Sequence, residues 1–159
     1  MTAAQLATLA AIGHQALFGA VAAAGFGVLF NFGARALAWC AAAGALALAV
    51  RTAGQTAGWS LEAATFAAAV GTSCAAILMR RWIGVACHAV ALAGCIPMVP
   101  GAFLGQALLG FVALTSPAIA EPVDTIVPAL QSMLRVISTV GAIGAGLAIP
   151  AHLLRSRHF

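Results

Sequence analysis

Residues 95–103 read CIPMVPGAF, and this short stretch decides how the chain has to fold. It places Pro97, Pro100 and Gly101 inside the largely apolar run of residues 82–114. A proline in a helix interior removes a hydrogen bond and clashes with the preceding turn, at about 3 kcal/mol or more. The residue before each proline is also pushed away from helical geometry. The stretch therefore predicts two half-helices that flank an unwound turn.

The composition places this run in a lipid bilayer. Hydrophobic residues make up 64% of the chain and charged residues 6%, which leaves too little polar surface to cover a water-soluble globule of 159 residues. The arginines are scattered between apolar runs, so we expect lipid as a partner and no nucleic acid. The first thirty residues lack the basic region of a cleaved signal, and we expect them to remain as a membrane span.

Five apolar runs can be counted against a bilayer core of about 30 Å, which requires about 20 helical residues. We therefore predict an all-α fold: a polytopic membrane helix bundle of about five transmembrane helices, with one broken at the IPMVPG segment. It would form a single transmembrane domain over residues 1–159, with no soluble domain. A hairpin of two short helices is the alternative for the fourth run. The runs are residues 6–30, 36–50, 61–79, 82–115 and 126–154.

The positions of the arginines orient this bundle, because basic loops tend to stay in the cytoplasm. Arg35, the pair at 80–81 and the tail arginines fall on one side, which predicts an outer N-terminus and a cytoplasmic C-terminus. Arg51 and Glu62 are then expected in the outer loop between the second and third spans. The four cysteines lie in apolar runs without CxxC spacing, so we expect neither a disulfide nor a metal site.

The break in the fourth run suggests a transport function. Irregular backbone at membrane depth is tolerated only where it is buried in protein or lines a watered cavity, so we expect this segment to face the interior of an assembly. Many transporters present broken helices to a substrate near the midplane. A proline-kinked helix or a surface loop is the simpler alternative. Gly101 and Gly105 have the spacing that lets another helix approach closely.

Three stretches resemble the threonine/serine exporter family. IPMVPG at 96–101 is similar to the family's signature, and GFGVLFNFGARALAWCAAAGALALAVR at 25–51 resembles the start of its C-terminal domain. GLAIPAHLLRSR at 146–157 resembles its last span. The chain departs from the family at Gly33, where relatives often carry a proline. The residues in register with the domain start are Phe30, Asn31, Arg35 and Gly44.

The resemblance also implies a function and a partner. Fused members carry a second hydrophobic domain and a soluble stretch that this chain lacks, so it is similar to the small subunit of a split form with a separate, larger membrane subunit. The family implies proton-driven export of threonine/serine or a small carboxylate such as succinate across the bacterial inner membrane, without a cofactor. A homo-oligomer is a further arrangement to consider. The alternative function is a non-transporting assembly subunit.

Arg135 is the main polar candidate in the last apolar run. A charge within a span tends to face the bundle interior, where it could hold an anionic carboxylate. An arginine that extends to the outer headgroups is the alternative. Neighbouring polar residues on or near its helical face are Gln131, Ser132, Ser138 and Thr139.

The remaining candidates each have a simpler structural explanation. Glu121 and Asp124 are candidate proton carriers, but acids also stabilise the start of a helix. Asn31 and Arg35 fit a turn with a basic anchor, and Gln106 fits repair of the carbonyls freed by the break, around Ile96. Paired histidines in spans suggest haem as a third alternative, and we find no motif of a membrane enzyme. The predicted substrate path comprises Pro97, Pro100, Gly101, Gln106, Asn31, Arg35 and Arg135; the histidines are His14, His88 and His152.

Overall fold

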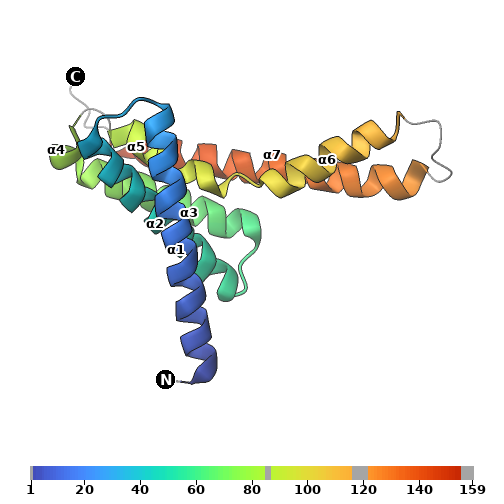
Figure 1. Cartoon of the computed structure of the whole chain (residues 1–159), viewed down its shortest axis with the longest axis horizontal. Helices are drawn as coiled ribbons and strands as arrows, with labels where there is room; N and C mark the ends of the chain where they lie inside the picture. The colour runs from blue at the N-terminus through green and yellow to red at the C-terminus, as the bar shows by residue number, and fades with distance from the viewer. Residues whose placement is uncertain (1, 85–86, 116–121, 155–159) are drawn as a thin grey trace. The chain divides into compact units, whose positions relative to one another are not determined.

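A computed structural model describes residues 2–84, 87–115 and 122–154. These residues form helices and contain no strand, which confirms the all-α prediction (Figure 1). The helices are α1 (Ala3–Leu29), α2 (Ala34–Thr56), α3 (Leu61–Leu78), α4 (Arg80–Ile83), α5 (Cys87–Cys95), the 3-10 helix η2 (Ile96–Met98), α6 (Gly101–Ala113) and α7 (Pro122–Leu153).

The lengths of these helices agree with the predicted spans. Among the described residues, four helices are long and apolar enough to cross a membrane, and a fifth span results if Cys87–Met98 and Gly101–Ala113 count together. The predicted bundle of about five transmembrane helices is therefore confirmed. α7 begins at Pro122, a first-turn position where the missing N–H of proline is not needed.

The second span is longer than its apolar run suggested. α2 continues through Arg51 to Thr56, whereas the prediction ended it at residue 50 and placed Arg51 in a loop. That placement is wrong. The helix continues because its last turns pack against α3, where Gly54 approaches Ala64. The chain turns at Gly58, whose φ of 87° favours glycine.

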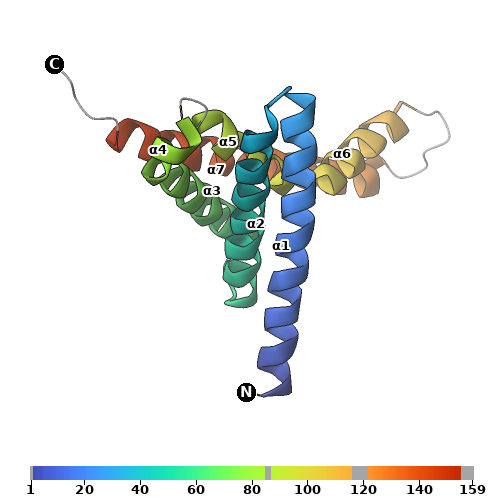
Figure 2. The same ribbon diagram turned by 60° about the vertical axis from the view of Figure 1, so that its left-hand side comes forward.

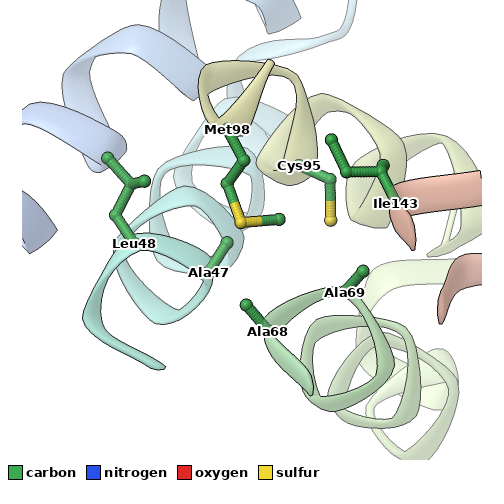
Figure 3. Close-up of a cluster of buried hydrophobic side chains, with 7 residues drawn as sticks. All are labelled: Ala47, Leu48, Ala68, Ala69, Cys95, Met98 and Ile143. Atoms are coloured by element: carbon green, nitrogen blue, oxygen red, sulfur yellow. The ribbon is translucent and has the colours of Figure 1, made fainter. Parts of the chain in front are cut away.

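The described helices divide into two compact units. The first comprises Met1–Met98 and Ala142–Phe159, and the second comprises Val99–Gly141. The core of the first unit is built from small side chains and sulfur-containing residues, with Met98 of η2 fully buried at its centre (Figure 3). Such small residues let membrane helices approach closely. The core residues are Ala47, Leu48, Ala68, Ala69, Cys95, Met98 and Ile143.

α1 and α2 form an antiparallel hairpin within the first unit, and the two helices lie side by side in both views (Figure 2). Their closest approach joins Gly19 to Gly44. A Cβ atom on Gly44 would overlap the backbone carbonyl of Gly19 and the side chain of Ala23. Glycine at these two positions therefore sets the distance between the helices.

The turn between α1 and α2 depends on the backbone of Asn31 and Gly33. Asn31 has a φ of 57°, in the left-handed region that asparagine tolerates better than most residues. Gly33 is the N-cap of α2, with φ −63° and ψ 154°. Proline has nearly the same φ, so this backbone also accepts a proline at this position.

We therefore expect Gly33→Pro to stabilise the chain by about 0.4–1 kcal/mol, because proline restricts the unfolded state without straining the folded one. A Cβ atom at Gly33 meets nothing within 4 Å, so the substitution has space. Thermal unfolding in detergent measures the effect. Gly58→Pro is the matched control, since its positive φ is closed to proline, and it should destabilise the chain. Equal effects of the two changes would contradict this account.

The second unit contains α6 and the first part of α7 as an antiparallel pair. Gly110 of α6 packs against Ala129 of α7, where an added Cβ would lie 2.6 Å from the alanine methyl group. A Cβ atom at Gly101 or Gly105 meets nothing within 4 Å, so no described residue approaches these glycines closely, and their use by another helix stays a prediction. α6 turns a different face to α7, and Gly110 lies on that face.

Candidate functional site

The predicted break lies where the two prolines are. α5 ends at Cys95, a single 3-10 turn follows, and α6 begins at Gly101 with Pro100 as its N-cap. Pro100 has a ψ of 73°, outside helical geometry, and it is buried, whereas Pro97 is half-buried. The N–H of Gly101 donates to the carbonyl of Val99 at 2.9 Å, a tight local turn. Two half-helices around an unwound turn are thus confirmed.

Arg51 holds the backbone at this break. Its Nη1 donates to the carbonyl oxygen of Met98 at 2.9 Å, and the guanidinium is partly buried. Met98 ends the 3-10 turn, where a carbonyl lacks the partner that a continuing helix would supply, and a charged donor forms a stronger hydrogen bond than a neutral one. A guanidinium has five N–H donors, and this contact uses one of them. Arg51 therefore stabilises the unwound turn from a neighbouring span.

Prediction from sequence missed Arg51, although one signal was present. Arg51 directly follows the apolar run of residues 36–50, and no proline or glycine separates it from that run. Its partner Met98 is 47 residues further along the chain, so no local pattern connects them.

Gln106 does not repair the break, contrary to the simpler explanation predicted for it. Its side-chain Oε1 accepts a hydrogen bond from Ser132 Oγ at 3.4 Å, across the pair formed by α6 and α7. Gln106 lies more than one turn into α6, so its side chain reaches α7 instead of the carbonyls of the preceding helix. The structure thus pairs two of the predicted polar residues with each other.

A buried hydroxyl lies further along the same face of α7. The register between α6 and α7 is set by Gln106 beside Ser132 and by Phe103 beneath Arg135. Thr139 lies two turns after Ser132 on the same face of α7, in the direction of the start of α6. Thr139 is 0% exposed, and its Oγ1 has no hydrogen-bond partner in the described part of the chain.

The polar stripe predicted around Arg135 is divided between two faces. Ser132 and Thr139 are buried, whereas Gln131, Arg135 and Ser138 are exposed. The Arg135 guanidinium lies 5.3 Å from the centre of the Phe103 ring, a cation–π contact. The hydroxyl of Ser138 donates to backbone carbonyls of its own helix. The buried residues, and not Arg135, therefore face the interior of the second unit.

The other predicted residues lie apart from the break or outside the description. Asn31 and Arg35 are exposed at the turn that begins α2. Arg35 lies about 24 Å of helical rise before Arg51, the residue that contacts the break. Asn31 and Arg35 therefore fit the simpler explanation, a turn with a basic anchor. Asp124 lies in the first turn of α7, and only its backbone is described; Glu121 lies outside the described residues.

Comparison with known proteins agrees with this architecture. A family model described as "Threonine/Serine exporter, ThrE" matches residues 15–153. The chain belongs to the threonine/serine exporter family. The match includes the broken segment and Arg51. It also includes the polar residues Gln106, Ser132 and Thr139 of the second unit. No solved structure matches the chain.

Family membership confirms the resemblance seen in the sequence. The threonine/serine exporter family is a family of membrane transporters and not of enzymes, in agreement with the multi-pass helical architecture. For a member of this family, the break between apolar half-helices and the buried hydroxyl of Thr139, unpaired among the described residues, are the features to relate to transport.

Proposed function

We propose that this chain is the membrane subunit of a secondary exporter for threonine, serine or a small carboxylate such as succinate. The proton motive force drives the export, and a larger membrane subunit of the same exporter completes the complex. The substrate path passes the break at Pro97, Pro100 and Gly101, with Gln106 nearby. Asp124 and Glu121 are the proposed proton carriers, and the C-terminus faces the cytoplasm.

The buried hydroxyl of Thr139 carries this proposal. An unpaired buried polar group costs about 1–3 kcal/mol, and native proteins hold few of them. A valine would fill the same space without that cost. A buried threonine whose hydroxyl has no partner among the described residues, on the face of α7 that carries Ser132, can bind a polar group of a passing substrate. Family membership supports the same function.

The contact between Arg51 and Met98, within the first unit, supports the proposal independently. A charged residue within a span is costly and usually functional. Here the charge holds an unwound turn open, and a turn without helical hydrogen bonds can offer its N–H and C=O groups to a ligand. A kink that served packing alone would need no charged residue to hold it.

The test compares Thr139→Val with Ser138→Ala in cells preloaded with labelled threonine, serine or succinate. Thr139→Val should lower efflux of the exported substrate about tenfold and leave stability equal or higher, because an unpaired buried hydroxyl is removed. Ser138→Ala removes an exposed hydroxyl one position away and should leave efflux unchanged. Full efflux from the Thr139→Val variant at matched membrane levels would overturn the assignment of Thr139.

The same assay distinguishes an exporter subunit from an assembly subunit. Efflux is measured from cells that express this chain with and without the larger membrane subunit. Export that requires both chains and depends on Thr139 supports the proposal. Export that requires this chain only for assembly of the complex, and that is indifferent to Thr139, favours the non-transporting alternative.

A further inference from the structure

The first unit contains a pocket of about 420 Å³ at the end where α3, α5 and α7 come together. Arg80 enters it from the start of α4, His88 from the first turn of α5, and His152 from the last turn of α7. Both views show these segments gathered around α4 and α5 (Figure 1 and Figure 2). The lining includes Ile77, Arg80, Cys87, His88, His152 and Leu154.

The polar groups of this pocket are hydrogen-bond donors or cations, and its lining contains no carboxylate. Arginine carries a permanent charge with five N–H donors, and each imidazole adds an N–H donor. The described residues contain no group of three metal-ligating side chains, so the donor set suits an anion better than a metal. Ile77 and Leu154 add apolar walls beside these groups.

The two adjacent arginines of α4 have different surroundings. The guanidinium of Arg81 lies 4.5 Å from the centre of the Trp82 ring, which is typical of a basic residue at a membrane surface. Arg80, one residue earlier, lines the pocket. If both arginines only marked the cytoplasmic side, there would be no reason for one of them to line a pocket together with two histidines from distant helices.

We propose that this pocket binds an oxyanion, the phosphate or carboxylate group of a small molecule or of a lipid headgroup. Arg80 supplies the charge, and His88 and His152 donate hydrogen bonds from opposite helices. The site is separate from the broken segment and does not depend on the proposed export activity. Its occupant would join three elements that are distant in the chain.

The test uses the full chain, purified in an uncharged detergent. Inorganic phosphate and succinate, each compared with chloride at equal ionic strength, are the soluble probes. Phosphatidylglycerol, compared with phosphatidylcholine in mixed micelles, is the lipid probe. Binding is measured by native mass spectrometry and by the shift of the unfolding temperature, because a ligand that binds the folded state raises it.

We expect at least one probe to bind saturably, and Arg80→Gln to weaken that binding about tenfold or more through loss of a charge-assisted hydrogen bond. Arg81→Gln removes the same charge next to the pocket and should change binding by less than about twofold. His152→Gln tests the opposite wall, with His14→Gln on the exposed face of α1 as its control. His152→Gln also keeps the test valid if Arg80→Gln fails to fold.

The probes distinguish the two sources of the anion. Binding of phosphate or succinate without competition by phosphatidylglycerol indicates a soluble ligand, whereas selective retention of phosphatidylglycerol indicates a lipid headgroup. Either kind of binding supports the proposal if the Arg80→Gln variant loses it and the Arg81→Gln variant keeps it. Equal losses in both arginine variants, or no saturable binding of any probe, would overturn it.

Discussion

Gly44→Val is expected to destabilise the chain by about 3 kcal/mol, at the upper end of the range for overpacked cores. Any Cβ atom at this position overlaps the carbonyl of Gly19 and the methyl group of Ala23. A backbone carbonyl cannot move aside by changing a rotamer, so α1 and α2 have to separate along their whole interface. Loss of folded protein on heating in detergent measures the effect.

Gly13→Val is the matched control for this change. Gly13 lies on the same hairpin, and a Cβ atom there meets nothing within 4 Å. The control carries the same side chain and the same gain in β-branching, so it reports any effect of helix propensity alone. An unfolding temperature of the Gly44→Val variant that equals that of the control would show that α1 and α2 are not packed as described.

Arg51→Leu should have the largest effect on the broken segment. It leaves the carbonyl of Met98 buried without a donor, at about 1–3 kcal/mol, and removes the contact that holds the unwound turn. We expect export to fall below about a tenth of the wild-type rate. We also expect Cys95, which is fully buried beside Met98, to become reactive toward alkylating reagents.

Arg51→Lys is the informative partner of this variant. An ammonium group can donate one hydrogen bond to the same carbonyl but lacks the planar fork of arginine. Compared with Arg51→Leu, the Arg51→Lys variant should recover protection of Cys95 from alkylation. It should recover less of the export rate if the guanidinium also contacts substrate. Unchanged alkylation of Cys95 in the Arg51→Leu variant, scored by mass spectrometry of the labelled peptide, would refute the role assigned to Arg51.

Local chemistry was sufficient to predict the helices and the break. Apolar runs of the right length become spans because the bilayer leaves the backbone few alternatives, and two prolines in one run interrupt its hydrogen bonds wherever they lie. The end of α2 was missed because packing of Gly54 against Ala64, a tertiary contact, extends the helix beyond its apolar run.

The functional contacts were harder to predict because they join distant parts of the chain. Arg51 and Met98, or Ser132 and Gln106, have no shared pattern in the sequence, and only the packing of their helices brings them together. Arg135 was overvalued for the opposite reason. A charged residue in an apolar run predicts a functional role, but Arg135 lies on the exposed face of α7. Ser132, one turn earlier, lies on the buried face.

The order of Arg51 and Met98 along the chain has a consequence for biosynthesis. Chains emerge from the ribosome N-terminus first, so the α1–α2 hairpin can insert and pack before the broken segment is made. Arg51 is then already in place when Met98 enters the bilayer 47 residues later. The carbonyl at the unwound turn therefore has a hydrogen-bond donor available as soon as it enters the bilayer. The α1–α2 hairpin, made first, offers a surface against which α3 and α5 can pack.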